Sequence, residues 1–298
     1  MTLWHKIRAS LVLIGITLNT LVLAVPLFSL ALIKLLIPVA RIRIWLSIIS
    51  VWVAETWIAI NSLLIELISR PHWQVEGLDG LSKHKWYLVT SNHQTWADIL
   101  VLQRVFNRRI PFLKFFLKQE LIKVPVLGLA WWALDFPFMK RYSRQQIEKN
   151  PTLAGRDIEA TRKACEKFRH IPVSIVNFAE GTRFRASRHQ QQDSSFSHLL
   201  KPRAGGTAFV LDAMGDTIDT LVDVTLYYPN GPAELADLFA NRIPEVHVHI
   251  RTLPIPDELK NGDYQNDPAY RENFQAWLNQ LWEDKDALLE KLQQTASV

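Results

Sequence analysis

SNHQTWAD, at residues 91–98, lies between two apolar runs, 86–89 and 99–102. The first run has the length of a short strand, and the second continues as a helical pattern, so the polar stretch marks a junction between a strand and a helix. A junction of this kind exposes polar side chains on a rigid frame. We therefore expect a functional site around His93 and Asp98, which are five positions apart.

Outward from this junction, from residue 73 onward, apolar runs typical of strands alternate with amphipathic stretches typical of helices. The alternation predicts an α/β fold in which a mixed, largely parallel sheet is flanked by helices. The stretch 185–197, rich in Gln and Ser, is expected to be a solvent-exposed loop. No repeat or linker divides this part, so we expect residues 71–298 to form one domain. The expected strands are 86–90, 110–116, 137–139, 173–178, 221–228 and 246–251, and the expected helices are 95–106, 127–134, 157–168, 205–214 and 273–292.

Two long apolar segments precede this domain. Residues 11–33 contain no charged side chain, and residues 44–65 contain only Glu55. Each segment is long enough to cross about 30 Å of hydrocarbon. On a helix, however, Glu55, Ser62 and Glu66 fall on one narrow stripe, a pattern more typical of a helix that lies in the membrane interface. A helical hairpin within one leaflet would also keep the Lys and Arg residues at 6, 8, 34, 41 and 43 on the cytoplasmic side. Residues 1–70 are therefore predicted to be an N-terminal membrane-associated helical hairpin, with a spanning pair as the alternative.

Charge and cysteine content narrow the class of ligand. Residues 103–144 hold nine Lys or Arg residues against two acidic ones, close in sequence to the membrane-like segments. This concentration suits anionic lipid or a phosphorylated substrate, whereas a nucleic-acid-binding protein would spread basic charge over one domain face. The single cysteine, Cys165, rules out an intrachain disulfide, as is usual in a reducing compartment.

The pairing of a histidine with an aspartate predicts a general base. If Thr95 caps the following helix, Asp98 lies in its first turn and can hold one ring nitrogen of His93. The other nitrogen is then free to accept a proton. Ser91 is a rival nucleophile, but it lacks the Gly-x-Ser-x-Gly turn that exposes a reactive serine. The sequence has no His-Glu-x2-His or paired-cysteine motif, so we expect no metal site.

FAEGTR, at residues 178–183, is a second polar stretch that follows an apolar strand. Gly181 permits a tight turn, and Thr182 and Arg183 supply hydrogen-bond donors after it. The planar fork of an arginine suits a phosphate group. This stretch is therefore predicted to bind an anionic part of the substrate.

The two stretches together, His93-x4-Asp98 and Glu180-Gly181-Thr182-Arg183, resemble the paired motifs of the glycerolipid acyltransferase family, which includes the 1-acylglycerol-3-phosphate acyltransferases. Between them, Lys118-x2-Leu121-x3-Pro125-x2-Gly128 and the following FMKR at 138–141 are similar to the intermediate block of that family. The resemblance covers roughly residues 73–228. One departure lies in the late block, usually a proline-containing apolar strand, where residues 221–226 contain Asp223 and no proline.

The resemblance implies acyl transfer from a thioester, acyl-CoA or acyl-ACP, to the sn-2 hydroxyl of 1-acylglycerol-3-phosphate, with phosphatidic acid as the product. It implies no bound cofactor, a bacterial inner membrane location and a catalytic domain that faces the cytoplasm. Three alternatives stay open: another lysophospholipid as acceptor, a catalytically silent membrane lipid-binding protein, and a thioesterase. The residue roles it implies are a general base, His93, oriented by Asp98, and a set that binds the acceptor phosphate, namely Glu180, Gly181, Thr182, Arg183 and Arg141.

Overall fold

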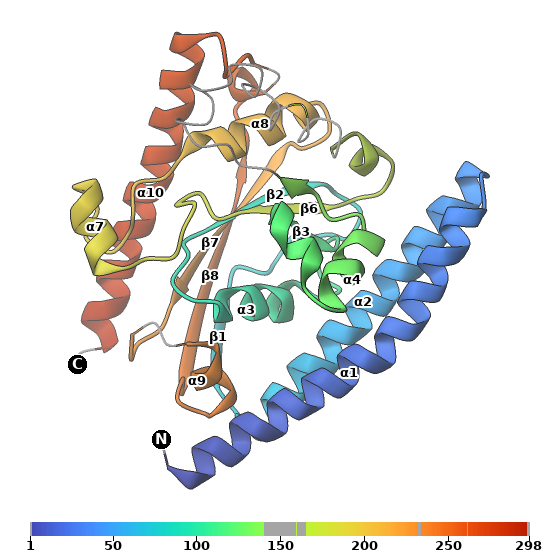
Figure 1. The fold of residues 1–298 in the computed structure, drawn as a ribbon. Coiled ribbons are helices and arrows are strands. Elements are labelled where there is room, and N and C mark those ends of the chain that lie inside the picture. Colours follow the sequence, from blue (N-terminus) through green and yellow to red (C-terminus); the bar gives the residue numbers. More distant parts are fainter. Residues whose placement is uncertain (1, 140–158, 160–164, 232–233, 261, 297–298) are drawn as a thin grey trace.

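The computed structural model describes residues 2–139, 159, 165–231, 234–260 and 262–296 (Figure 1). Two long helices come first, and strands and shorter helices alternate after them. The elements in chain order are α1 (Leu3–Leu36), α2 (Ala40–Ile68), β1 (His72–Glu76), β2 (Tyr87–Ser91), α3 (Ala97–Phe106), β3 (Leu113–Phe115), β4 (Leu117–Lys118), the 3-10 helix η1 (Gln119–Lys123), α4 (Leu127–Ala133), β5 (Phe138–Met139), the 3-10 helix η3 (Lys167–His170), β6 (Ser174–Asn177), α7 (Ala186–Gln192), α8 (Ala204–Met214), β7 (Thr220–Tyr227), α9 (Leu235–Phe239), β8 (Glu245–Pro254), the 3-10 helix η4 (Asp257–Leu259) and α10 (Pro268–Ala296).

The main sheet has six described strands in the order β1-β8-β7-β2-β6-β3. All neighbouring pairs are parallel except β7 and β8, which are antiparallel, so the expected mixed, largely parallel sheet is confirmed. Strand β2 lies between β7 and β6, and all five of its residues are buried, as in parallel sheets that are covered on both faces. Because β2 and β6 run parallel, the stretches that follow them, 92–98 and 178–183, leave the sheet at the same edge.

Two hydrophobic cores cover the two faces of this sheet (Figure 1). Tyr87 and Val89 of β2 pack in the core shared with α1, α2 and α3. Between them in the strand, Leu88 points to the opposite core, which is built with α8 and α10. This period of two along the strand is the alternation that a sheet requires. The central strand is thereby fixed from both sides, and so is the loop that continues from it.

Three expectations about local structure need correction. Strand β1 is not among the expected strands. It is an edge strand whose residues alternate between exposed and half-buried, so it lacks a continuous apolar run. The stretch expected to be a loop at 185–197 contains helix α7. The N-cap position of α3, which begins at Ala97, is Trp96 and not Thr95, although the Thr95 hydroxyl accepts the Ala97 N–H at 3.3 Å. Most of the expected helix 157–168 lies outside the described residues.

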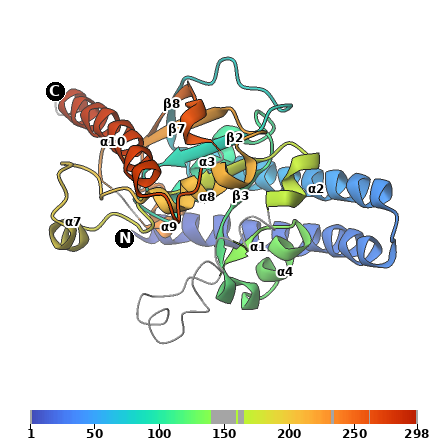
Figure 2. The same ribbon diagram turned by 90° about the horizontal axis from the view of Figure 1, so that it is seen from above.

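Helices α1 and α2 form a hairpin of two apolar helices packed side by side (Figure 2). Both are long and apolar enough, by length and composition, to cross a membrane. Large apolar side chains remain on the outer surface, including Trp45 at 67% and Trp52 at 60% exposure. Between the helices the Asn19 side-chain amide donates to Asn61 Oδ1 at 2.7 Å. Polar side chains in the apolar segments therefore join the two helices to each other.

The hairpin lies along the domain rather than projecting from it. Helix α1 contacts α9 near the N-terminal end and α4 toward the other end (Figure 1). At the end of α1, the Lys34 ammonium lies 2.5 Å from a carboxylate oxygen of Asp135. At the end of α2, the Ser69 hydroxyl donates to the Phe239 carbonyl at 2.8 Å. Both ends of the hairpin are thus attached to the sheet-bearing part of the chain.

Candidate active site

The loop after β2 is anchored by Asn92, whose side chain substitutes for a strand partner. Its amide nitrogen donates to the Leu226 carbonyl at 2.9 Å, and its carbonyl oxygen accepts from the Leu226 N–H at 2.8 Å. The Gln94 side chain also donates to the Leu226 carbonyl, at 3.1 Å. Asn92 is fully buried, so these bonds are protected from water. Strand β7 therefore sets where the next residue, His93, leaves the sheet.

His93 and Asp98 are in contact. Nδ1 of His93 lies 2.8 Å from Oδ2 of Asp98, which is the direct pairing expected of these two residues. The His93 ring also stacks on Phe178, with ring centroids 4.0 Å apart and planes at 17°. The side chain is 12% exposed. Among the described residues no partner is found for Nε2, so a ring held through Nδ1 keeps Nε2 available as a proton acceptor.

Asp98 is fully buried and saturated with donors. Its Oδ2 accepts the backbone N–H groups of Gln94 and Thr95 at 2.6 and 2.9 Å, so the aspartate closes the loop that leads into its own helix. Its Oδ1 accepts the Tyr228 hydroxyl at 2.7 Å. Burial, with the neighbouring Asp98 carboxylate, raises the pKa of Tyr228 well above its ordinary value, so this hydroxyl remains a donor. The carboxylate is thus fixed in place before any substrate binds.

Glu180 lies beneath this loop and not at the surface. It is 1% exposed, and its Oε1 accepts the His93 backbone N–H at 3.3 Å. Among the described residues its Oε2 has no hydrogen-bond partner. Burial raises the pKa of Glu180 to about 8, an effect that the His93 N–H opposes. On the other side of the loop, the Phe184 N–H donates to the His93 carbonyl at 2.7 Å. Both backbone polar groups of His93 therefore bond to the segment 180–184.

The other residues of the second stretch face outward from the turn. Gly181 has a φ of 69°, a left-handed conformation that favours glycine. The Arg183 guanidinium lies over the Trp96 ring, with its central carbon 4.9 Å from the ring centroid. The Thr182 hydroxyl accepts a hydrogen bond from Arg188 of α7. Arg183 therefore stands next to the His93 loop, half-buried and with its donors oriented by an aromatic surface.

The structure describes the predicted site only in part. Arg141 lies outside the described residues. The intermediate block is described up to Met139, and Gly128 within it is required by packing, because a Cβ there would lie 2.2 Å from the Ile122 carbonyl oxygen. In the described part of the chain, no group of three His, Cys, Asp or Glu side chains is placed to hold a metal ion.

Three contributors to the site were missed from sequence. Leu226 lies at the end of β7, Tyr228 directly follows that strand, and Phe178 starts the second stretch. The only signal for the first two was their place at the carboxyl end of an expected strand. The local sequence pattern does not predict which strand lies beside β2, because sheet order depends on contacts that are distant in sequence.

A family model described as Acyltransferase matches residues 72–226, which contain both stretches. Lysocardiolipin acyltransferase 1 of Danio rerio is 26% identical over 258 residues, covering 82% of this chain and 61% of that protein. The 2-acyl-1-lysophosphatidylinositol acyltransferase of Saccharomyces cerevisiae is 26% identical over 251 residues, covering 69% of this chain and 61% of that protein. This chain thus spans about three fifths of the length of these relatives.

This chain is also similar to a mammalian acyltransferase and to a bacterial one of known structure. The 1-acyl-sn-glycerol-3-phosphate acyltransferase epsilon of Mus musculus is 22% identical over 221 residues, covering 67% of this chain and 56% of that protein. The crystal structure of the 1-acyl-sn-glycerophosphate acyltransferase PlsC from Thermotoga maritima matches 93% of this chain and 97% of that chain, with a TM-score of 0.51 and 14% identity. The structural likeness shows that the fold is shared.

Proposed function

This chain belongs to the glycerolipid acyltransferase family, and on that premise we propose that it moves a fatty acyl group from a thioester to the sn-2 hydroxyl of 1-acylglycerol-3-phosphate. The product is phosphatidic acid. The observation that carries the proposal is the 2.8 Å contact between His93 Nδ1 and Asp98 Oδ2, in a loop that leaves Nε2 available. Such an arrangement can deprotonate an alcohol at neutral pH.

The reaction follows in two steps. His93 Nε2 accepts the proton of the lipid hydroxyl while the hydroxyl oxygen attacks the thioester carbonyl carbon, which gives a tetrahedral intermediate. The intermediate then expels the thiolate, and the imidazolium returns its proton to that sulfur. Asp98 stabilises the imidazolium between the steps, and general base catalysis of this kind contributes about 10²–10⁴ in rate. No acyl group is transferred to the protein.

The second stretch binds and positions the acceptor in this proposal. Gly181, Thr182 and Arg183, together with Arg141, hold the phosphate beside the His93 loop. Glu180 contributes from below, because its buried carboxyl group accepts the His93 N–H and so sets the height of the histidine. Holding the hydroxyl in place supplies much of the rate acceleration, since pre-orientation removes the entropic cost of bringing two reactants together.

The membrane supplies the acceptor. Residues 1–70 serve as the anchor for the domain formed by 71–298, and the hairpin lies in one leaflet of the bacterial inner membrane with the domain on the cytoplasmic side. The attachment of both hairpin ends to the domain supports this placement, because two spanning helices would carry their connecting turn to the opposite face. The donor is acyl-CoA or acyl-ACP, and no bound cofactor takes part.

A second candidate keeps the chemistry and changes the acceptor. Two of the relatives are named for lysocardiolipin and for 2-acyl-1-lysophosphatidylinositol, so an acceptor with a substituted phosphate is the alternative. It assigns the protein to remodelling of finished phospholipids instead of their synthesis. A catalytically silent lipid-binding protein is the third reading, and the same experiment tests it.

A matrix of donors and acceptors on the purified full chain separates these functions. Palmitoyl-CoA and palmitoyl-ACP are each offered with lysophosphatidic acid, lysophosphatidylglycerol and lysophosphatidylinositol, and His93→Ala is the blank. We expect the highest kcat/KM with lysophosphatidic acid. A higher value with a substituted lysophospholipid replaces the first proposal by the second, and turnover at the level of the blank with every pair supports the silent protein.

A further inference from the structure

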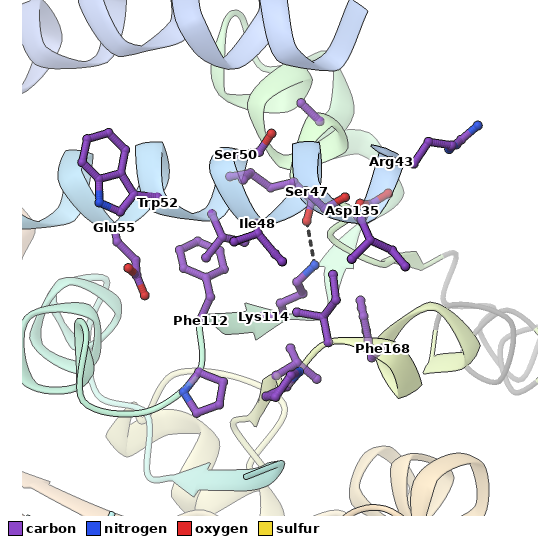
Figure 3. A pocket seen from close by; sticks show the side chains of 18 of the residues that line it. Arg43, Ser47, Ile48, Ser50, Trp52, Glu55, Phe112, Lys114, Asp135 and Phe168 are labelled. Carbon is purple, nitrogen blue, oxygen red and sulfur yellow. Dashed lines mark hydrogen bonds between the residues drawn. The ribbon is translucent and has the colours of Figure 1, made fainter. Parts of the chain in front are cut away.

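A cavity lies away from the His93 site. It has a volume of about 600 Å³ and lies between the first half of α2 and the chain that leads into β3 and β6 (Figure 3). Its lining includes Phe112 and Val173, which come just before these strands, whereas Glu180 follows the end of β6. At about 3.3 Å per residue, the four steps from 173 through β6 to 177 place the two ends of this stretch about 13 Å apart.

The lining of the cavity is apolar with an excess of positive charge. Ile48 of α2 faces Phe112 and Phe168 across it (Figure 3), and Ile44 also lines it. Among the described lining residues, four are basic and two are acidic. The basic residues are Lys34, Arg43, Lys83 and Lys114, and the acidic ones are Glu55 and Asp135. A ligand that fits such a lining has an apolar part and a negative group.

Three of the four basic side chains have a described partner, and one exposed side chain does not. Lys34 is neutralised by its ion pair with Asp135, and Lys114 is buried, with its ammonium 2.7 Å from the Leu134 carbonyl oxygen. Arg43 has no hydrogen bond or ion pair from its side chain to any described residue. Lys83 faces Glu55, which also lies 3.8 Å from Arg108 and so is shared by two cations. Of these four basic residues, Arg43 is therefore the one that is free to bind an anion, and it lies 12 residues of α2, about 18 Å, from Glu55.

This cavity adjoins the surface that the hairpin presents to lipid. Ile48 and Trp52 line it and are themselves exposed, by 45% and 60% of their surface. Trp45, on the same stretch of α2, is exposed by 67%. A bilayer lipid can thus reach the cavity along α2 without passing through water. The volume lies within the range of about 300–1,000 Å³ found for ligand pockets.

We propose that this cavity is a second lipid site, which binds an anionic membrane phospholipid by its phosphate group and the upper part of its acyl chains. Arg43 holds the phosphate, and the wall formed by Ile44, Ile48 and Phe112 covers the chains. The bound lipid joins α2 to the strand that begins at Leu113, so it fastens the hairpin to the domain. The site takes membrane phospholipid and not the acceptor, which distinguishes it from the place where acyl transfer occurs.

Native mass spectrometry of the purified full chain tests this site, with phosphatidylglycerol and phosphatidylcholine as probes. The test variant is R43Q. The control is R41Q, which removes the same charge at an exposed neighbour that does not line the cavity. We expect wild type and control to retain one phosphatidylglycerol in preference to phosphatidylcholine, and R43Q to lose this preference by about tenfold or more. Equal losses in the two variants, or equal retention of the two lipids by wild type, overturn the proposal.

Two additional variants keep this test independent of the acyltransferase reaction. Ser47→Trp places a large side chain into the cavity and is expected to remove the bound phosphatidylglycerol while all charges remain. His93→Ala is expected to bind phosphatidylglycerol like wild type, whatever its effect on turnover. Displacement of phosphatidylglycerol by an equal concentration of lysophosphatidic acid contradicts the proposal, because it assigns the cavity to the acceptor.

Discussion

His93 is held by contacts of its backbone and of its ring. Its N–H and carbonyl bond to the 180–184 segment, its ring stacks on Phe178, and its Nδ1 contacts Asp98. The ring is thereby fixed in position and in the nitrogen that it presents. Single substitutions around it are expected to change catalysis by different mechanisms, which kinetics can separate.

Asp98→Asn tests the role of the charge next to the imidazole. The variant keeps the size of the side chain but cannot stabilise an imidazolium, so kcat is expected to fall by about 10²–10⁴ while KM for the acceptor changes little. Tyr228→Phe is the control, since it removes one donor to Asp98 and leaves the carboxylate in place. Activity of Asp98→Asn within tenfold of wild type, measured by steady-state transfer, removes Asp98 from the mechanism.

Arg183→Ala tests the phosphate contact. A charge-assisted hydrogen bond contributes about 1.5–3 kcal/mol, so KM for lysophosphatidic acid is expected to rise about 10- to 100-fold with a smaller change in kcat. Arg185→Ala removes the same charge from an exposed neighbour two positions along the chain and is expected to leave KM within about threefold. Should both variants raise KM equally, Arg183 acts only through the general field.

The raised pKa of Glu180 predicts how the stability of the fold depends on pH. Burial raises its pKa from 4.5 to about 8, so the folded chain holds this proton more tightly than the unfolded chain. Stability from this group is then lost as pH rises from about 4.5 to about 8, by an amount on the order of a few kcal/mol. Glu180→Gln keeps an acceptor for the His93 N–H and cannot ionise. Its Tm in detergent is expected to match wild type at pH 5 and to exceed it increasingly up to pH 9, whereas a constant difference contradicts the assignment.

At the scale of elements, helix α10 explains the charged residue in β7 that departs from the family pattern. Asp223 is buried, and its carboxylate lies 2.7 Å from Lys285 Nζ and 2.7 Å from Arg251 Nε. Lys285 also donates to the Val224 carbonyl at 2.6 Å. Lys285 of the C-terminal helix therefore helps to neutralise the Asp223 carboxylate of β7. The end of the same strand, at Leu226, holds Asn92 and the His93 loop.

Lys285→Met is expected to destabilise the fold strongly, by about 3–5 kcal/mol, because it leaves a buried carboxylate with fewer partners. Adding Asp223→Val is expected to recover most of this loss, since the strand then buries only apolar groups. Lys291→Met, at an exposed position of the same helix, serves as the control and is expected to change Tm little. These values are read from thermal unfolding in detergent. A double variant no more stable than Lys285→Met refutes the pairing.

The elements that carry the two motifs could be predicted from sequence because each combines an apolar run with a turn signal. Strands β2 and β6 and helix α3 appear close to their expected positions. What could not be predicted depends on distant partners. Glu55 and Glu66 form the expected stripe on α2, but this stripe faces Arg108 and Arg104 at the end of α3. Nothing in the local pattern indicates whether an acidic stripe meets water or arginine side chains.

At the scale of the whole molecule, the hairpin determines how the site meets the membrane. Helix α1 contacts the domain near both of its ends, so its apolar outer surface runs along one side of the molecule (Figure 2). A bilayer that covers this surface approaches the domain from that side. Under the proposed function, the acceptor reaches His93 from this side of the molecule.

Labelling with a membrane-impermeant maleimide tests the one-leaflet placement. Burial raises the pKa of Cys165 to about 12, so the native thiol is expected to stay unreactive. Pro38→Cys places a thiol at the turn of the hairpin, and Ser187→Cys places one on the domain. Both are expected to react from the same side of sealed vesicles. Reaction from opposite sides shows that the helices span the bilayer.

Acyl transfer by His93→Ala in a purified preparation is the most direct measurement of the central claim. Phosphatidic acid formed from palmitoyl-CoA and lysophosphatidic acid is quantified beside His84→Ala, a control at an exposed histidine of the same domain. We predict that His93→Ala falls to the background rate while its Tm and its binding to vesicles stay at wild-type values, and that His84→Ala retains full turnover. Turnover by folded His93→Ala within tenfold of wild type would contradict the proposal that this imidazole deprotonates the lipid hydroxyl.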